Sequence, residues 1–370
     1  MSDSVYNFGA GPATLPSSVI DQVKSNLHDF SNGMSIMEVS HRSTAFKDYA
    51  DQSEVSIRKL LNISDDYVVL FLQGGATFQF TMVPQNLSER GSNKNYQTKG
   101  STNYLITGGW SKKAADYAKF HTSVNTVFDS SENSYTCIKD IKDWNINPDV
   151  DYFYYCANET VHGLEIHETP DVNSPIICDM SSTLCTRPIN INDFDLIFAG
   201  AQKNLGIAGL TIVIVKKELI NGKAKHLPPI LRYESHSLDN SMLNTSPVFA
   251  WYVAGLVFEW IIAQGGLELM SELNQEKSSL LYDFIDDSQL YKNSVNPKYR
   301  SWVNIPFTIT SNNLDERFLN EAKCKGLMNL KGHRTVGGMR ASVYNAMPIE
   351  GVKKLIAFMK NFETTNFKDV

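Results

Sequence analysis

Short apolar runs alternate with helix-like stretches along most of this chain, and no other feature constrains the fold as strongly. Residues 67–72 (YVVLFL) form an unbroken apolar run that ends at Gly74-Gly75, which is typical of a strand buried on both faces. Similar runs follow at residues 104–107, 152–156, 175–178, 195–199 and 211–215. Polar-apolar stretches such as 111–120 are long enough to form crossover helices between them. The alternation predicts an α/β fold whose sheet is largely parallel and covered on both faces.

The pattern changes near residue 265. Beyond it we expect a long helix, a strand and two further helices, at residues 267–286, 303–310, 315–325 and 349–362. This order is typical of a smaller α+β domain. Near the other end, apolar residues recur at helical spacing through residues 19–30, after Pro16. Because 370 residues suggest two domains, we predict a large α/β domain at 15–265 and a small α+β domain formed by 1–14 and 266–370.

Charge and cysteine content argue against several classes of protein. The formal net charge of -6 provides no basic excess with which to neutralise nucleic-acid phosphates. No apolar run approaches the roughly 20 residues of a membrane span, and the first residues carry neither the positive nor the apolar segment of a secretory signal. The five cysteines form no CxxC pair. We therefore expect a cytoplasmic protein that binds no nucleic acid, no membrane and no metal.

Two ionisable residues follow predicted strands, at the edge where α/β sheets bind ligands. Asp179 comes directly after an apolar run, and a buried carboxylate is costly unless it meets a positive partner. A protonated pyridine nitrogen is such a partner, and pyridoxal 5′-phosphate (PLP) needs that proton to act as an electron sink. Lys203 lies beside glycine and apolar sequence, where desolvation lowers a lysine pKa and favours imine formation. Taken alone, Asp179 is more typical of a turn cap and Lys203 of a surface lysine, but together they favour a PLP site.

Three further strand exits carry residues suited to a flat, phosphorylated cofactor. Gly74-Gly75-Ala76-Thr77 joins a strand to an expected helix, whose N-terminus can bind an anion. Trp110 can present its indole face to an aromatic ring, a contact that contributes about 0.5–1.5 kcal/mol beyond area burial. Thr160 can hydrogen-bond a phenolic oxygen. The last two residues can equally be interpreted as a core tryptophan and a loop cap.

Two basic clusters lie in the remaining sequence. His41-Arg42 is near the start, and Gly332–Arg340 (GHRTVGGMR) is near the end. Arginine is suited to bidentate recognition of carboxylate and phosphate groups. Basic clusters are more often solvated surface features, although surface clusters rarely contain an interleaved Gly-Gly-Met such as the one in the second cluster. Together the two clusters fit a substrate with two or three negative groups.

Longer segments resemble the phosphoserine aminotransferase family, in order from about residue 5 to about residue 362. These segments are Asn7-Phe-Gly-Ala-Gly-Pro-Ala, Met37-Glu-Val-Ser-His-Arg, Asn158-Glu-Thr-Val-His-Gly, Gly200-Ala-Gln-Lys-Asn, Lys331-Gly-His-Arg and Gly337-Gly-Met-Arg-Ala-Ser-Val-Tyr-Asn-Ala. The resemblance implies a class V aminotransferase of the fold type I PLP-dependent architecture, with a large PLP-binding domain built on a mostly parallel, mixed sheet. It also implies a cytoplasmic homodimer with shared active sites that acts in serine biosynthesis. Its reaction would exchange an amino group between phosphoserine/3-phosphohydroxypyruvate and L-glutamate/2-oxoglutarate.

Carried over residue by residue, the resemblance implies specific roles. Lys203 forms the Schiff base and Asp179 pairs with the pyridine nitrogen, while Trp110 stacks on the ring and Thr160 contacts the ring oxygen. The residues implied beside the cofactor phosphate are Ala76, Thr77 and Gln202, together with Asn244 and Thr245 of the partner subunit. The residues implied at the substrate are Arg340 for its α-carboxylate, and His41, Arg42, His333 and Arg334 for its phosphate or distal carboxylate.

The chain also departs from the family, and several different functions compete with this one. Some members carry Gly-Arg in place of Ala76-Thr77, and some carry a serine in place of Ala10. A cysteine desulfurase of the same fold would need a loop cysteine, whereas Cys324 falls in an expected helix. An alanine–glyoxylate aminotransferase, a nicotinamide-dependent oxidoreductase and a ligand-binding protein without turnover also compete, although the oxidoreductase lacks its strand–GxGxxG–helix unit. The sequence leaves open whether 4-phosphohydroxy-L-threonine is a further substrate.

Overall fold

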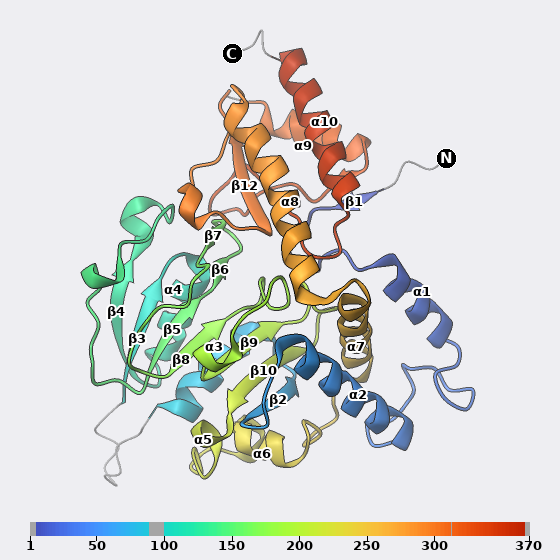
Figure 1. Ribbon diagram of the computed structural model, residues 1–370, viewed down its shortest axis with the longest axis vertical. Coiled ribbons are helices and arrows are strands. Elements are labelled where there is room, and N and C mark those ends of the chain that lie inside the picture. The colour runs from blue at the N-terminus through green and yellow to red at the C-terminus, as the bar shows by residue number, and fades with distance from the viewer. Residues whose placement is uncertain (1–4, 89–99, 312, 367–370) are drawn as a thin grey trace.

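The computed structural model describes residues 5–88, 100–311 and 313–366 (Figure 1). Within these ranges the largest sheet has seven strands. In spatial order they are β2 (Tyr67–Leu72), β10 (Thr211–Lys216), β9 (Leu196–Gly200), β8 (Ile176–Asp179), β5 (Tyr152–Cys156), β3 (Ser101–Ile106) and β4 (Ser123–Asp129). β10 is antiparallel to both of its neighbours, whereas the other pairs are parallel. The prediction of a mixed but mostly parallel sheet is confirmed.

The central strands are mostly apolar because both faces of this sheet are covered. Val69 and Phe71 of β2 belong to one buried cluster, with residues of α2 (Thr44–Leu61) and α7 (Val248–Ala263). The intervening Leu70 and Leu72 belong to a second cluster, with residues of α3 (Gly75–Leu87) and α4 (Gly109–Ala118). Successive side chains of a strand point to opposite faces. Each strand therefore contributes to both clusters, which α1 (Ser17–Asn26), α5 (Lys217–Ile220) and α6 (Tyr233–Leu238) extend.

The first helix is shorter than its apolar spacing predicts. α1 begins after Pro16, as expected, but ends at Asn26 rather than near residue 30. Phe30 instead packs edge-on against Tyr49 and Tyr252, with ring centroids 6.0 and 5.6 Å away. Its apolar side chain therefore serves tertiary packing between α1, α2 and α7 rather than a continued helix.

The C-terminal elements form a third buried cluster together with the start of the chain (Figure 1). They are α8 (Gly266–Asp287), β11 (Tyr291–Lys292), β12 (Asn304–Ile309), α9 (Asp315–Cys324), β13 (Leu327–Met328), β14 (Met339–Ser342) and α10 (Ile349–Asn366). β11, β12 and β14 form an antiparallel sheet, and β1 (Tyr6–Asn7) pairs in parallel with β13. The expected helices and strand are present, while the domain boundaries at residues 14/15 and 265/266 stay a prediction.

α7 differs from the other long helices because it is apolar around its whole circumference. Most of its residues are buried, among them Trp251, Tyr252 and Phe258. Its neighbours are α1, α2 and α8, so it lies at the centre of the helical layer on one face of the sheet. Among the described helices, none alone is long and apolar enough to cross a membrane, and α7 with α8 passes that test only as a pair bent by 85°.

Candidate active site

The parallel strands place their carboxyl ends at one edge of the sheet, where there is a cavity of about 140 Å³. β5 ends at Cys156, β8 at Asp179 and β9 at Gly200, so the segments that follow them converge there. The lining residues are Gly75, Ala76, Thr77, Phe80, Trp110, Cys156, Asn158, Asp179, Ser181, Gln202 and Lys203. The structure thus brings together six of the predicted cofactor residues from four separate strand exits.

Lys203 projects into this cavity and contacts the predicted Thr160. Its Nζ donates a hydrogen bond to Thr160 Oγ1 at 2.6 Å and lies 5.7 Å from the centroid of the Trp110 ring. Burial lowers the pKa of Lys203, and the neighbouring Asp179 carboxylate partly offsets that effect. Desolvation of this kind increases the fraction of the neutral amine, which is the nucleophilic form.

Asp179 is 4% exposed at the end of β8. Its Oδ1 accepts a hydrogen bond from the Ser181 backbone N–H at 2.9 Å. Burial raises the pKa of Asp179, whereas Lys203 and the hydrogen bond from Ser181 lower it. A carboxylate kept in such a site is stabilised further by any cationic ring nitrogen that enters the cavity.

The N-terminus of α3 faces the same cavity. Gly74 precedes the helix with φ of +99°, and a Cβ there would lie 2.7 Å from the Phe78 side chain. Glycine is therefore required for the chain to turn directly from β2 into the helix. The first-turn residues Gly75, Ala76 and Thr77 line the cavity. Free backbone N–H groups and the helix dipole make this end of the cavity suitable for a phosphate.

Arg340 reaches the site from β14 in the C-terminal part of the chain. Its Nη1 donates to the backbone carbonyl oxygen of Thr160 at 3.3 Å. Its Nε is buried and has no hydrogen-bond partner among the described residues. Burial lowers the pKa of this guanidinium. Arg340 therefore keeps hydrogen-bonding capacity for a carboxylate beside Thr160 and Lys203.

The remaining basic residues lie outside the cavity lining. His41 is 8% exposed, and Arg42 Nε donates to its Nε2 at 3.3 Å. Arg42 lines a different depression of about 420 Å³, together with Lys47 and Asp239. His333 is exposed, with its Nδ1 2.8 Å from Thr335 Oγ1, and Arg334 beside it is also exposed. None of these four residues lines the cavity at Lys203.

Asn244 and Thr245 are exposed and contact the end of β2 rather than the cavity. Asn244 Nδ2 donates to Gln73 Oε1, and Gln73 Nε2 donates to the carbonyl oxygen of Thr245, both at 2.9 Å. The expectation for this pair is a contact across a subunit interface. It stays a prediction, because the structure is of one chain.

Sequence reasoning overlooks three polar residues at the site. Ser181 binds Asp179, and its Oγ also accepts the backbone N–H of Gly200 at 3.2 Å. Asn158 donates to Ser182 and Asn304, while its buried Oδ1 has no partner among the described residues. Glu159 contacts the start of α4. All three belong to segments at strand exits, so their position in the sequence is the available signal.

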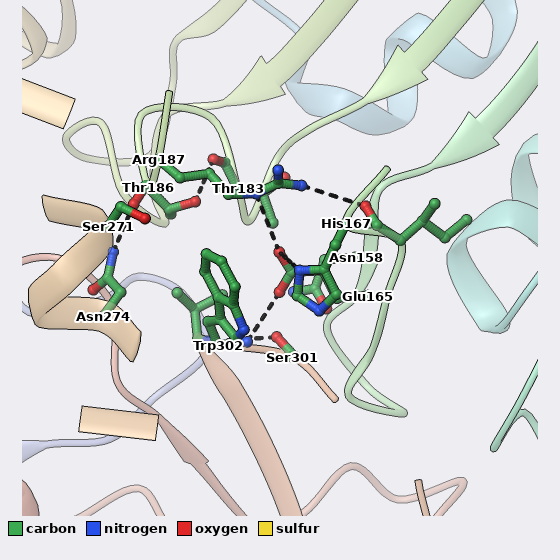
Figure 2. A network of polar contacts seen from close by, with 12 residues as sticks. Asn158, Glu165, His167, Thr183, Thr186, Arg187, Ser271, Asn274, Ser301 and Trp302 are labelled. Atoms are coloured by element: carbon green, nitrogen blue, oxygen red, sulfur yellow. Dashed lines mark hydrogen bonds and ion pairs between the residues drawn. The ribbon is translucent and has the colours of Figure 1, made fainter. Parts of the chain in front are cut away.

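Asn158 and Glu159 form β6 (Asn158–Glu159), which pairs with β7 (Leu164–Glu165) in a hairpin. A second buried polar network lies on this hairpin. Figure 2 shows His167, Arg187 and Trp302 grouped around the Glu165 carboxylate. Glu165 Oε2 accepts the backbone N–H of Trp302 at 3.0 Å, and its Oε1 lies 3.6 Å from His167 Nδ1 and 3.8 Å from Arg187 Nε. Glu165 is 1% exposed and does not line the cavity at Lys203.

The arrangement of lysine, carboxylate, indole and helix N-terminus agrees with the comparisons with known proteins. A family model described as aminotransferase class-V matches residues 5–355. The chain belongs to the class-V aminotransferases. Within that family it is similar to the phosphoserine aminotransferase of Vesicomyosocius okutanii, with 47% identity over 363 residues that cover 98% of this chain and 99% of that protein.

Two solved structures of class-V aminotransferases are also similar to this chain. The phosphoserine aminotransferase of Bacillus circulans subsp. alkalophilus matches with a TM-score of 0.93 and 38% identity, over 99% of this chain and 100% of that one. The PLP-bound phosphoserine aminotransferase of Trichomonas vaginalis matches with a TM-score of 0.90 and 36% identity, over 96% and 100%. The predicted fold type I architecture is confirmed.

Proposed function

We propose that this chain is a PLP-dependent phosphoserine aminotransferase of serine biosynthesis. It exchanges an amino group between phosphoserine/3-phosphohydroxypyruvate and L-glutamate/2-oxoglutarate. The observation that carries the proposal is the convergence of Lys203, Asp179 and Trp110 with the N-terminus of α3 on one cavity. Relatives of nearly the same length, up to 47% identical, bear that name and support it.

The residues present fit PLP. The cavity has an anion-binding helix end at Ala76 and Thr77, an indole ring at Trp110 and a buried carboxylate at Asp179. Asn158 also lines this cavity, and its buried Oδ1 has no hydrogen-bond partner among the described residues. A polar ligand satisfies such atoms, whereas an apolar one leaves them unpaired. PLP combines the phosphate, the aromatic ring and the basic nitrogen that these groups require.

Each side chain then has a defined task. PLP, when bound, supplies an electron-withdrawing ring that acidifies the Cα–H of an amino acid. Asp179 would hold a proton at the ring nitrogen, because its buried carboxylate gains a cationic partner there. Lys203 would accept the Cα proton at Nζ, since burial lowers its pKa and Thr160 fixes its position at 2.6 Å. Trp110 would cover one face of the ring and exclude water.

Substrate recognition uses charges from other parts of the chain. Arg340 would bind the α-carboxylate through the donors that it does not give to Thr160. His41, Arg42, His333 and Arg334 would bind the phosphate of phosphoserine or the distal carboxylate of L-glutamate. Because His41 and Arg42 do not line the cavity of their own chain, we propose a cytoplasmic homodimer in which a partner completes each site with His41, Arg42, Asn244 and Thr245.

The cofactor assignment is tested by colour and by reduction. We expect the purified protein to be yellow, and borohydride to bleach it and leave PLP covalently attached to Lys203. Peptide mapping by mass spectrometry locates the attachment. A colourless protein that PLP does not reconstitute would refute the assignment and favour the oxidoreductase. A yellow protein without turnover would favour a ligand-binding protein.

The substrate assignment is tested by comparing kcat/KM for phosphoserine and for serine. Loss of the phosphate removes charge-assisted hydrogen bonds to arginine, so we expect a preference of at least about 100-fold for phosphoserine. Equal values would contradict the roles of the two basic clusters and favour an alanine–glyoxylate type of enzyme. The same assay with 4-phosphohydroxy-L-threonine decides whether it is a second substrate.

Sharing of sites between subunits is tested by complementation. We expect Lys203→Ala and Arg42→Ala to be inactive separately. When mixed and reassembled at equal concentration, half of the dimers are mixed and each has one intact site, so activity recovers to about one quarter of wild type. Absence of recovery, despite mixed dimers shown by native mass spectrometry, would place Arg42 in the site of its own chain.

A further inference from the structure

The helix that carries Trp110 has no side chain at its N-cap position to accept its first-turn N–H groups, and Ser111 Oγ instead accepts the N–H groups of Thr107 and Gly108 before that turn. α4 begins at Gly109, and the preceding Gly108 offers no side-chain acceptor. The first N–H groups of a helix have no intrahelical partner, so another group must accept their hydrogen bonds. In this protein the acceptor is Glu159, which lies 49 residues away from Trp110 in the sequence.

Glu159 makes three hydrogen bonds to the first turn of α4. Its Oε2 accepts the backbone N–H of Trp110 at 2.9 Å, and its Oε1 accepts the backbone N–H of Ser111 at 2.8 Å and Ser111 Oγ at 2.6 Å. The residue is fully buried. Burial raises the pKa of Glu159, whereas the hydrogen bonds from Ser111 and Trp110 lower it. An ionised carboxylate at this position is also stabilised by the helix dipole.

The space around this carboxylate is fitted to it. A Cβ at position 108 would overlap the carboxyl group of Glu159, so glycine is required there for steric reasons. The usual caps, serine, threonine or aspartate at position 108, would therefore displace Glu159. The first-turn N–H groups of Trp110 and Ser111 are therefore capped from the β6–β7 hairpin instead of from position 108.

The hairpin that supplies this cap also supplies two residues of the site. Asn158 lines the cavity, and Thr160 accepts the hydrogen bond from Lys203. Glu159 lies between them, so its bonds to α4 fix Trp110 relative to the segment that holds Lys203. The Trp110 backbone is tied directly, and its ring lies 5.7 Å from Lys203 Nζ.

We propose that Glu159 is a positioning residue for PLP. It holds the first turn of α4 in place relative to Thr160 and Lys203, and so places Trp110 against the cofactor. This inference rests on the proposed function, because it assumes that Trp110 stacks on the cofactor. Glu159 itself does not line the cavity. It determines where the indole lies, and Trp110 makes the contact.

The test is a double-mutant cycle on PLP affinity, measured by dialysis of the apoprotein against PLP alone. Glu159→Gln keeps the size of the side chain but places an amide where two acceptor oxygens are needed, so we expect the dissociation constant for PLP to rise about 10-fold. In a Trp110→Leu background, the same change is expected to alter it less than 2-fold. The circular dichroism of the PLP absorption band should weaken in Glu159→Gln, as it reports ring orientation.

Glu165→Gln is the matched control. Glu165 lies on the same hairpin, is equally buried and also accepts the backbone N–H of a tryptophan. Its polar partners are Trp302, His167 and Arg187 (Figure 2), none of which belongs to α4. We expect it to change PLP affinity less than 2-fold. Ser111→Ala is the second variant if Glu159→Gln does not fold. It removes one of the three bonds to Glu159, together with the bonds that Ser111 Oγ accepts from the N–H groups of Thr107 and Gly108. Its effect on PLP affinity should also disappear in the Trp110→Leu background.

Each result decides between the proposals. Equal effects of Glu159→Gln with and without Trp110, or an equal loss in Glu165→Gln, would overturn the positioning role and leave the proposed function intact. Unchanged PLP affinity and unchanged dichroism in Glu159→Gln would also overturn the positioning role and leave the proposed function intact. Wild-type apoprotein that does not bind PLP would overturn both.

Discussion

Lys277 provides a test of how strongly the interior of the protein opposes charge. It lies on α8 and is 2% exposed. Its Nζ donates to the carbonyl oxygens of Tyr344 and Met347 at 2.7 and 3.2 Å. Burial lowers the pKa of Lys277 from 10.5 to about 7. Because two neutral carbonyl groups do not replace the hydration of an ammonium ion, the charged form is destabilised in the folded state.

The sign of the effect on stability follows from proton binding. Between pH 7 and pH 10.5 the unfolded chain binds a proton at Lys277 that the folded protein lacks, so the free energy of unfolding rises with pH in this window. The destabilisation is fully present below pH 7, where it corresponds to about 5 kcal/mol, and it is lost towards pH 10.5. Between pH 7 and pH 9 the gain in stability is about 2 kcal/mol.

Urea unfolding of wild type and Lys277→Met at pH 7 and pH 9 measures this pH-dependent destabilisation by Lys277. We expect the stability of wild type relative to the variant to be about 2 kcal/mol greater at pH 9, because methionine does not titrate. Lys323→Met, at an exposed position of α9, is the control and should change stability by no more than about 0.5 kcal/mol at either pH. A difference between wild type and Lys277→Met that is the same at both pH values would refute the reasoning.

Three other substitutions test the site. Asp179→Asn should leave the protein yellow but lower kcat by about 100-fold or more, measured in steady-state assays, because an amide does not keep the ring nitrogen protonated. Arg340→Lys should raise KM for phosphoserine about 10-fold, since lysine does not bind a carboxylate bidentately. Gly74→Ala should lower stability by about 1–3 kcal/mol in thermal unfolding, because φ is +99° and the new Cβ meets Phe78.

These results have clear opposites. A near wild-type kcat in Asp179→Asn would show that Asp179 does not act on the ring nitrogen. An unchanged KM in Arg340→Lys would show that Arg340 does not bind the α-carboxylate. Gly222 has φ of +71° but open space around it, so Gly222→Ala is the control for backbone strain alone. If it costs as much as Gly74→Ala, the contact with Phe78 has no role.

The sequence predicts the central strands well, because a strand buried on both faces contains an apolar run that can be recognised without knowing its neighbours. It does not predict α7 or β4, and for opposite reasons. α7 is apolar on all sides, so it lacks the periodicity that identifies a helix. β4 is partly exposed along most of its length, so it lacks the apolar run that identifies a strand. Both depend on neighbours that local spacing does not reveal.

At the site, the same distinction separates the residues that the sequence predicts from those that it does not. Asp179 and Lys203 are predictable because both follow apolar strands, and the two ionisable residues together indicate a site that neither indicates alone. Glu159 is not, although it is fully buried, because a glutamate between an asparagine and a threonine has the sequence character of a loop. Its partners in α4 are 48 and 49 residues away. The contact of Arg340 with Thr160 spans 180 residues, and no spacing rule reaches that far.

The pairing of β1 with β13 joins residues more than 300 positions apart. At roughly 5–20 residues per second, translation reaches Leu327 about 16–64 s after Tyr6 is made. Until then β1 has no strand to pair with. The segment after β1 includes Gly11, where an added Cβ would lie 3.4 Å from Lys203 Cγ, and Ala13, whose backbone N–H binds the carbonyl oxygen of Gln202. The segment that packs against Lys203 and Gln202 therefore gains its strand partner only after more than 300 further residues have been made.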